Sequence, residues 1–339
     1  MPNTKPLILV THALPANWLS PLAEKCRLMV GPAGGAGFTP ELEEHLLEAD
    51  ALFTLLVDPV TEDILERAPN LKVVSQMAVG VDNVDVAACT RRGIPVGNTP
   101  GVLTAGTADL AFGLLLAAAR RIPEAQADAR AGRWTTWNPT GWLGADLDGA
   151  TLGIVGMGKI GVAMARRAQG FGMKIIFSNR SPLSKIEKNF NARQVPLDDL
   201  LEQSDFVSLH IPLTKETHHL IDAAALRKMK PSAILVNSAR GPVVDTNALY
   251  EALTKGWIAA AGLDVTDPEP LPQEHPLYAL SNCVITPHIG SASFNTRRRM
   301  AEIACQNVLA GLEGRRLLHC VNPEWMQHIS SVQRPSLSS

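Results

Sequence analysis

The chain has no Cys-x-x-Cys pair, no excess of basic side chains and no apolar run of membrane-spanning length. Its five cysteines are odd in number and scattered, which favours reduced thiols in the cytoplasm over disulfides. With 31 Lys and Arg against 33 Asp and Glu, the net charge is −2, so we expect no nucleic acid partner. Without a long apolar run, we expect no membrane partner either.

A metal site is also not expected. His210, His218 and His219 lie close together in the sequence, but Glu216 is the one acidic neighbour that accompanies them. Their spacing does not match the ligand patterns of zinc sites.

What the chain does have is a regular alternation of strand-like and helix-like segments. A length of 339 residues predicts two domains, and the alternation predicts parallel sheets with helices on both faces. We therefore expect an α/β fold of two doubly wound parallel-sheet domains. One, flavodoxin-like and substrate-binding, is formed by residues 1–101 and 290–329. It is interrupted by a Rossmann NAD(P)-binding domain at residues 102–289, which opens on a long helix predicted from 104 to 127. The polar segment 330–339 is predicted to be a disordered tail.

The strongest single motif lies past the middle of the chain. The apolar strand Thr151–Val155 leads into Gly156-Met157-Gly158-Lys159-Ile160-Gly161, a G-x-G-x-x-G turn followed by a helical pattern. The first glycine permits a tight turn, the second lets the backbone approach a pyrophosphate, and the third allows close helix–strand packing. These residues predict a dinucleotide site at a helix N-terminus.

The end of the next strand indicates which dinucleotide binds. An acidic residue there would accept hydrogen bonds from the ribose of NAD, but the chain has Asn179-Arg180-Ser181. The planar guanidinium of Arg180 suits a phosphate, and Asn179 and Ser181 add neutral donors. We predict that NADP(H) is preferred, with NAD(H) as the alternative.

Three side chains of complementary chemistry follow later strands. Arg240, Glu269 and His288 each come after a predicted parallel strand, at the edge where open α/β sheets bind ligands. Reduction of a 2-oxo acid needs a cation for the carboxylate, which Arg240 can supply, and a proton donor. His288 can donate the proton because histidine titrates near neutral pH, and Glu269 would favour its charged form. Spacing alone does not show that the three converge.

Several motifs in order resemble those of the D-isomer-specific 2-hydroxyacid dehydrogenases. They are the glycine turn, Asn237-Ser-Ala-Arg-Gly-Pro-Val-Val-Asp245, Gly262-Leu-Asp-Val265 with Pro268-Glu-Pro270, and Thr286-Pro-His-Ile-Gly-Ser291. Within that family the stretches 262–272 and 288–293 look most like the glyoxylate/hydroxypyruvate reductases. The resemblance runs from about residue 8 to about residue 325.

The resemblance implies a role for each matching residue. Arg240 would bind the substrate carboxylate and carbonyl, His288 would be the acid/base, and Glu269 its partner. Two further sets are implied. The cofactor would be lined by Thr107, the glycine turn, Ser238, Ala239, Arg240, Asp264, His288 and Gly290. The substrate would meet the backbone of Val79 and Gly80 and the side chain of Ser291.

The resemblance also implies a homodimer, with the helix near 104–127 at its interface. The segment Trp134-Thr-Thr-Trp137-Asn-Pro-Thr-Gly-Trp142 loosely matches one that reaches toward a partner's active site in such reductases. An ordinary aromatic packing patch explains it as well.

Other functions stay open from the sequence. A sibling dehydrogenase acting on D-lactate and pyruvate, on longer 2-oxo acids or on phosphite shares the motifs, and Leu55, Leu56 and Val57 could line an apolar pocket. Val79 stands where the phosphite-oxidising branch has a lysine, which disfavours that substrate. A dinucleotide-sensing corepressor-like binding protein is the alternative from a different class.

Overall fold

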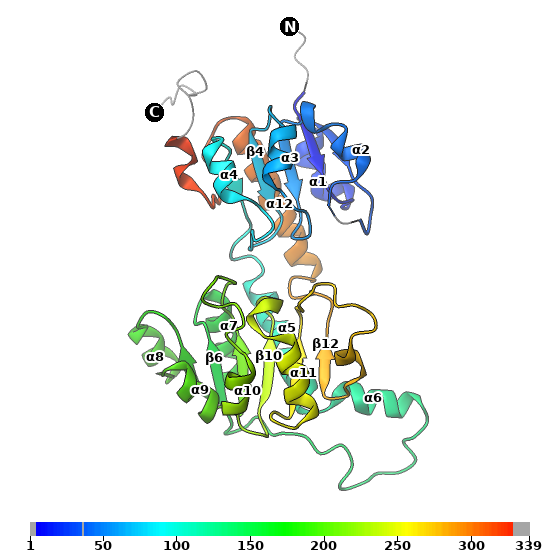
Figure 1. Cartoon of the computed structure of the whole chain (residues 1–339), viewed down its shortest axis with the longest axis vertical. Coiled ribbons are helices and arrows are strands. Elements are labelled where there is room, and N and C mark those ends of the chain that lie inside the picture. Colours follow the sequence, from blue (N-terminus) through cyan, green and yellow to red (C-terminus); the bar gives the residue numbers. More distant parts are fainter. Residues whose placement is uncertain (1–4, 36, 328–339) are drawn as a thin grey trace. The chain divides into compact units, whose positions relative to one another are not determined.

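The chain folds into two compact units (Figure 1). The computed structural model describes residues 5–35 and 37–327, so the predicted tail at 330–339 lies outside it. The first unit consists of the residues up to Val102 and those from Ser293 onward, and the second unit is Leu103–Ala292. The limits predicted from the sequence are 101 and 290. Each unit has one parallel sheet with helices on both faces, which confirms the predicted fold class.

The first unit has a five-stranded sheet in the order β2-β1-β3-β4-β5, with every neighbouring pair parallel. This is the flavodoxin-like order. The strands are β1 (Leu7–Val10), β2 (Arg27–Val30), β3 (Ala51–Thr54), β4 (Val73–Gln76) and β5 (Val96–Gly97). The helices are α1 (Ala16–Ala23), α2 (Pro40–Glu43), α3 (Glu62–Arg67), α4 (Val86–Arg91) and α12 (Phe294–Leu312), with short 3₁₀ turns at Leu46–Glu48 and Pro323–Gln327.

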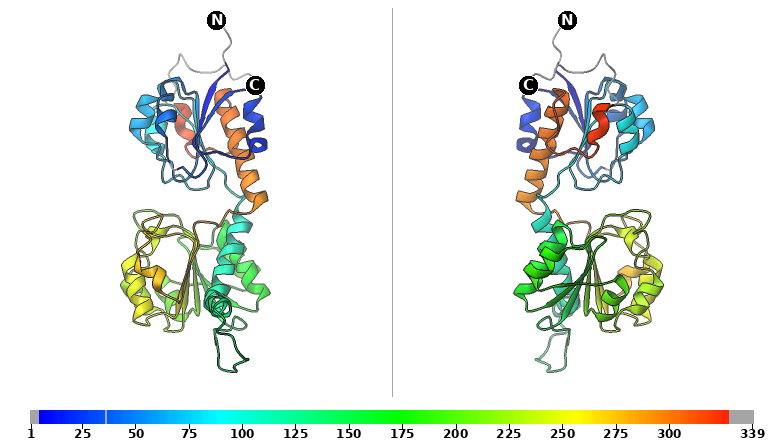
Figure 2. Two further views of the ribbon diagram at one scale, coloured as in Figure 1. Left: turned by 90° about the vertical axis from the view of Figure 1, so that its right-hand side faces the viewer. Right: turned by 90° about the vertical axis from the view of Figure 1, so that its left-hand side faces the viewer.

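The C-terminal part of the chain completes this unit. Helices α12 and α1 pack together on one face of the sheet, and α2, α3 and α4 lie on the other (Figure 2). A Cβ on Gly311 would come within 2.5 Å of Val73, so α12 packs against β4 with no side chain at that point. Beyond α12, the buried side chain of Asn322 accepts a hydrogen bond from Val96 N at 2.8 Å and donates one to the Ile94 carbonyl at 3.0 Å.

The second unit has a seven-stranded parallel sheet in the order β12-β11-β10-β9-β6-β7-β8. Counted from β6, this is the Rossmann order extended by one strand. The strands are β6 (Thr151–Val155), β7 (Lys174–Ser178), β8 (Arg193–Gln194), β9 (Phe206–Leu209), β10 (Ile234–Asn237), β11 (Ala260–Leu263) and β12 (Cys283–Ile285). The helices are α5 (Thr104–Ala119), α6 (Ile122–Arg130), α7 (Lys159–Gly170), α8 (Ser184–Phe190), α9 (Leu197–Gln203), α10 (Ala223–Lys228) and α11 (Thr246–Thr254), with 3₁₀ turns at Gly241–Val243 and Pro276–Ala279.

The prediction of a single helix from 104 to 127 is wrong. Helix α5 ends at Ala119, and α6 begins at Ile122 after a break in which Arg121 adopts the left-handed conformation, with φ of 53°. Pro123 lies in the first turn of α6, where its missing N–H is tolerated. The same proline inside a continuous helix would lose a hydrogen bond and clash with the preceding turn.

Apolar strands and capped helices explain why these elements form. The four residues of β1, Leu-Ile-Leu-Val, are all buried, as expected of a strand covered on both faces. Helices α4, α11 and α12 are capped at their N-termini by Asp85, Asp245 and Ser293, whose side chains accept hydrogen bonds from backbone N–H groups of the first turn. Each such cap contributes about 1 kcal/mol. In both sheets the carboxyl ends of the strands lead into loops, and these loops can hold functional side chains.

Candidate active site

The glycine turn after β6 has the geometry that a dinucleotide needs. Gly156 has φ of 94°, and a Cβ there would lie 2.6 Å from the His210 carbonyl oxygen. A Cβ on Gly161 would lie 2.2 Å from the Gly156 carbonyl oxygen. Gly158 is different: it is exposed, and an added Cβ would meet nothing within 4 Å. Two glycines are therefore required by the fold, and the third leaves open space beside the N-terminus of α7, where a pyrophosphate would fit.

The end of β7 lies beside this turn. The Gly156 N–H donates to the Ser178 carbonyl at 2.9 Å, and the Met157 N–H donates to Asn179 Oδ1 at 3.3 Å. The amide of Asn179 also donates to the Ser181 carbonyl at 3.1 Å. Asn179 therefore fixes the strand end to the glycine turn, while the side chains of Arg180 and Ser181 are exposed at the same edge.

A buried carboxylate holds the loop that carries His288. Asp264, 2% exposed at the end of β11, accepts hydrogen bonds from Thr286 Oγ1 at 2.7 Å, Ile289 N at 2.8 Å and Gly290 N at 2.7 Å. Thr107, on α5, donates to the Gly290 carbonyl at 3.3 Å. Thr107, Asp264 and Gly290, all expected near the cofactor, thus hold the 286–290 loop in one conformation.

His288 and Glu269 form a direct pair. His288 Nδ1 lies 2.5 Å from Glu269 Oε1, and Glu269 Oε2 accepts from Thr266 N at 3.3 Å. Burial raises the pKa of Glu269, but the hydrogen bond with His288 and the nearby positive groups lower it below its usual value. The pair leaves His288 Nε2 as the ring nitrogen that can face a substrate.

The backbone of His288 adopts an uncommon conformation, with φ of 52°. For a residue with a Cβ, the left-handed region costs of the order of 1–3 kcal/mol. The His288 N–H donates to the carbonyls of Asp264 and Thr286, both at 3.0 Å, and these hydrogen bonds help hold it there. Backbone strain of this kind clusters at functional sites, where a side chain is held in one orientation.

Arg240 comes from the neighbouring loop, after β10. The Ala239 N–H donates to Asn237 Oδ1 at 3.0 Å, and Asn237 Nδ2 donates to the Arg240 carbonyl at 2.9 Å, so the loop is tied to its own strand. A Cβ on Gly241 would lie 1.8 Å from the Thr266 carbonyl oxygen, which brings the loops after β10 and β11 into contact. The charge of Arg240 contributes to lowering the pKa of Glu269.

The residues predicted for catalysis therefore share one edge of the second unit. Strands β10, β11 and β12 are adjacent, and Arg240, Glu269 and His288 follow their carboxyl ends in that order. Ser238 lies beside Arg240, and its hydroxyl is buried without a hydrogen-bond partner among the described residues. An unsatisfied buried hydroxyl at a ligand-binding edge fits a bound polar group.

The residues predicted to contact substrate through their backbone belong to the first unit. Val79 and Gly80 follow β4, and in the described part of the chain their N–H groups donate to no protein acceptor. Val79 is 37% exposed. Ser291 follows Gly290 in the second unit. That these residues contact the same substrate as Arg240 stays a prediction.

His210 is not among the residues that the sequence predicts for the nucleotide site. His210 follows β9, the strand next to β6, and its carbonyl lies against Gly156. Burial lowers the pKa of His210 to about 4, so its ring is neutral at pH 7, with Nε2 2.9 Å from Ser208 Oγ. Its position after the strand next to β6 puts it at the sheet edge where open α/β sheets bind ligands, which is the signal in the sequence that could have pointed to it.

Residues 5–35 and 37–327 contain no cluster of three or more His, Cys, Asp or Glu side chains suited to a metal ion. The same residues contain no helix that is long and apolar enough to cross a membrane.

Comparisons with known proteins agree on one family. Residues 112–290 match the model of the D-isomer specific 2-hydroxyacid dehydrogenase, NAD binding domain. A glyoxylate reductase of Korarchaeum cryptofilum is 50% identical over 321 residues, covering 94% of this chain and 97% of the relative. A crystal structure of a protein from Thermus thermophilus matches with a TM-score of 0.87 and 49% identity, covering 93% of this chain and 99% of that one.

A further solved structure is informative about ligands. An NADPH-dependent glyoxylate/hydroxypyruvate reductase from Sinorhizobium meliloti, in complex with NADP and malonate, matches with a TM-score of 0.82 and 32% identity. The match covers 95% of this chain and 98% of that one.

Proposed function

Because the chain belongs to the D-isomer-specific 2-hydroxyacid dehydrogenases, enzymes that use NAD(P), we propose that it is an NADPH-preferring reductase of glyoxylate and hydroxypyruvate. The observation that carries the proposal is the His288–Glu269 pair, 2.5 Å apart, beside the loop of Arg240 at one sheet edge. The names of the relatives from Korarchaeum cryptofilum and Sinorhizobium meliloti support the choice of substrate.

The dinucleotide is held by the carboxyl edge of the seven-stranded sheet. The open space at Gly158 and the buried hydroxyl of Ser238, which has no partner among the described residues, fit a ligand along this edge. Bound NADPH supplies the hydride for the reduction. The residues that line it are Thr107, Gly156, Met157, Gly158, Lys159, Ile160, Gly161, Asn179, Arg180, Ser181, Ser238, Ala239, Arg240, Asp264, His288 and Gly290.

The preference for NADPH rests on the end of β7. No carboxylate follows Ser178 there, and the exposed guanidinium of Arg180 can pair with a 2′-phosphate in a charge-assisted contact. An acid at this point would repel that phosphate.

The side chains divide the chemistry among them. Arg240 binds the carboxylate of the 2-oxo acid and polarises its carbonyl oxygen. His288 donates a proton from Nε2 to that oxygen as the carbon accepts a hydride, so the carbonyl becomes a hydroxyl and the imidazolium becomes neutral. Glu269, kept ionised by its lowered pKa, stabilises the imidazolium and fixes the proton on Nδ1. Val79 and Gly80 offer N–H groups to the carboxylate, and Ser291 adds a hydroxyl.

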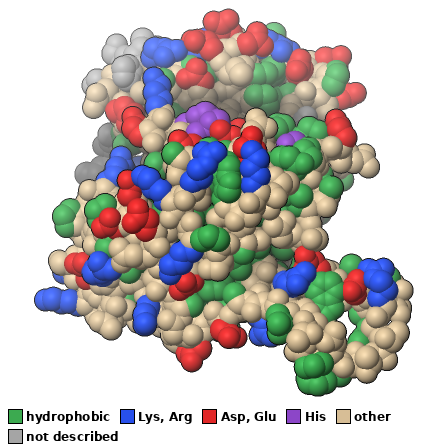
Figure 3. Space-filling model, turned by 60° about the horizontal axis from the view of Figure 1, so that its bottom comes forward, with side chains coloured by type: hydrophobic (Ala, Val, Ile, Leu, Met, Phe, Trp, Pro, Cys, Tyr) green, Lys and Arg blue, Asp and Glu red, His purple; other side chains and the backbone are tan. Residues whose placement is uncertain are grey.

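Assembly as a homodimer in the cytoplasm is part of the proposal. Helix α6 buries no side chain, and the segment after it exposes Trp134 (77%) and Trp137 (80%). Figure 1 shows that this segment extends away from the sheet of the second unit, and Figure 3 shows hydrophobic side chains on a projecting lobe. Exposed aromatic side chains of this size are suited to an interface, here with a second copy. The five cysteines are all free, as in a reducing compartment. A purified protein that stays monomeric by light scattering would contradict the dimer.

A steady-state panel tests the activity. Glyoxylate, hydroxypyruvate, pyruvate and phosphite are each assayed with both cofactors, in the direction that each substrate allows. We expect glyoxylate and hydroxypyruvate with NADPH to give the highest kcat/KM. Preferred turnover of pyruvate would favour a D-lactate dehydrogenase, and turnover of none would favour a dinucleotide-binding protein.

A further inference from the structure

A buried polar network at the carboxyl edge of the first sheet is not explained by packing alone. Thr54 Oγ1 donates to Gln76 Oε1 at 2.6 Å, and Gln76 Nε2 donates to Asn83 Oδ1 at 2.6 Å. Both Thr54 and Gln76 have no exposed surface. The network therefore begins in the interior, on two adjacent strands, and ends at Asn83 in the loop after β4.

Asn83 passes the network on to a second loop. Its Nδ2 donates to the carbonyl of Leu55 at 3.0 Å and to that of Asp58 at 2.6 Å. These two carbonyls bound the 55–58 turn after β3, which is closed by a hydrogen bond from Asp58 N to the Leu55 carbonyl at 3.1 Å. The amide of Asn83 thus holds both ends of the turn, and every one of its polar atoms is used.

The side chain of Asp58 holds the same turn from within. It is 1% exposed and accepts hydrogen bonds from Thr11 Oγ1, from Leu55 N at 2.6 Å and from Gly37 N at 2.9 Å. Thr11 follows β1 and the turn follows β3, so this contact bridges the point where the strand order reverses. Ligands of open α/β sheets bind at that point.

The groups that lie on the two loops beside this network suit a small organic acid. The tip of the 55–58 turn exposes Leu56 (39%) and Val57 (48%). The neighbouring 78–82 loop ends directly before Asn83 and carries the N–H groups of Val79 and Gly80. Apolar contact and backbone donors are what the substituent and the carboxylate of a 2-oxo acid require.

We propose that Asn83 is a positioning residue that fixes the 55–58 turn relative to the 78–82 loop, and so sets both carboxylate binding and the size of the accepted 2-oxo acid. The inference rests on the proposed function, because it assigns the substrate side of that reaction to these two loops. Asn83 touches no reacting atom and acts through the loops that it joins.

The test compares Asn83→Ala with Asn70→Ala. Asn70 lies in the same unit and also donates from Nδ2 to a carbonyl, that of Leu47, at 2.8 Å, but it takes no part in the network. For Asn83→Ala we expect the KM for glyoxylate to rise roughly tenfold or more, as the removal of one partly buried hydrogen-bonding group allows, with kcat changed little. The preference for glyoxylate over pyruvate should fall, and the NADPH dissociation constant should stay unchanged. Asn70→Ala should alter none of these.

A wild-type KM and preference in Asn83→Ala, or equal changes in Asn70→Ala, would overturn the inference. Val57→Ala is an exposed substitution that leaves the core intact, so it gives a result even if Asn83→Ala does not fold. It should lower the preference for glyoxylate over pyruvate, and an unchanged preference counts against the inference. Failure of the wild-type protein to reduce any 2-oxo acid would instead contradict the proposed function.

Discussion

Two buried aspartates, one in each unit, accept similar sets of hydrogen bonds, yet the loops that they hold carry different kinds of groups. Asp264 and Asp58 each accept hydrogen bonds from one threonine hydroxyl and two backbone N–H groups at the carboxyl edge of a parallel sheet. The loop held by Asp264 carries the titratable side chain of His288. The turn held by Asp58 carries apolar side chains and lies beside the backbone donors of Val79 and Gly80.

The proposed function assigns proton transfer to side chains of the second unit and carboxylate binding to backbone groups of the first. Side chains that move a proton must be held in one orientation, and the left-handed backbone of His288 is an example. Backbone donors need only the right loop path, which a network such as that of Asn83 can set. We therefore expect changes in the second unit to act mainly on kcat and changes in the first unit to act mainly on KM.

Removal of the proposed proton donor should have the largest effect. His288→Ala takes away the side chain to which we assign protonation of the carbonyl oxygen, so kcat should fall about 10³-fold, within the range of general acid catalysis. The NADPH dissociation constant, measured by fluorescence titration, should stay near that of the wild-type protein. A loss of less than tenfold would identify another proton donor.

Glu269→Gln should be the next most damaging change. It keeps the shape but removes the charge that stabilises the imidazolium, so we expect kcat to fall roughly a hundredfold. Steady-state assays with glyoxylate measure this effect, and a kcat near that of the wild-type protein would show that His288 acts without its partner.

The same pair also predicts how stability depends on pH. The folded-state pKa of Glu269 lies below its unfolded value of about 4.3, so its stabilising contribution is present above that pH and is lost as the pH falls through the folded pKa. The Tm difference between the wild-type protein and Glu269→Gln should stay nearly constant from about pH 7 to about pH 5 and narrow as the pH falls below about 4.3. A constant difference would show that the charge of Glu269 adds no stability.

A matched pair of substitutions tests the comparison most directly. Asp264→Asn and Asp58→Asn each turn an amide toward backbone N–H groups, and each should cost about 1–3 kcal/mol of stability because buried donors then lack an acceptor. With similar losses in Tm, Asp264→Asn should lower kcat by roughly tenfold or more, and Asp58→Asn should raise the KM for glyoxylate instead. Equal effects of both variants on kcat and KM would show that the two loops do not divide the reaction.

Arg180→Ala tests the cofactor end of the second unit, away from the acid/base pair. Loss of a charge-assisted hydrogen bond to a 2′-phosphate costs about 1.5–3 kcal/mol, so the KM for NADPH should rise about tenfold or more. The KM for NADH and the kcat should change little. Parallel increases for both cofactors would remove Arg180 as the source of preference.

Prediction from the sequence works where a residue type is required by the backbone. The glycine turn, the alternation of strands and helices, and the placement of Arg240, Glu269 and His288 after parallel strands follow from local patterns, whereas the sheet order is what shows that those strands are neighbours. It failed at the 104–127 helix, where Pro123 was outweighed by a strong apolar pattern, and it missed the two-residue edge strand β8. Asp58, Gln76 and Asn83 gave no local signal, because their partners lie up to 47 residues away and are identified only by the fold.

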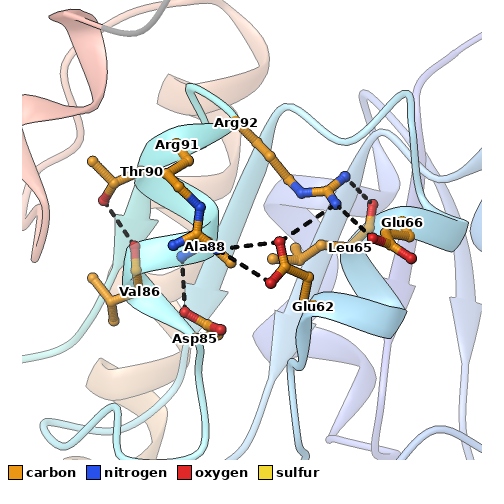
Figure 4. Close-up of polar contacts among 9 residues, drawn as sticks. All are labelled: Glu62, Leu65, Glu66, Asp85, Val86, Ala88, Thr90, Arg91 and Arg92. Atoms are coloured by element: carbon orange, nitrogen blue, oxygen red, sulfur yellow. Dashed lines mark hydrogen bonds and ion pairs between the residues drawn. The ribbon is translucent and has the colours of Figure 1, made fainter.

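The smallest effect is expected on the outer face of the first unit, where polar contacts are numerous but exposed. Arg91 on α4 donates to both carboxylate oxygens of Glu62 on α3, at 3.1 and 3.2 Å, and Arg92 lies 3.5 Å from Glu66 (Figure 4). Solvent screens such pairs, so Arg91→Ala should lower stability by less than about 1 kcal/mol and leave kcat and KM unchanged. Thermal unfolding and the glyoxylate assay check both. A changed KM would mean that α3 and α4 transmit strain to the loops after β3 and β4, and that substrate binding depends on more of the first unit than the buried network.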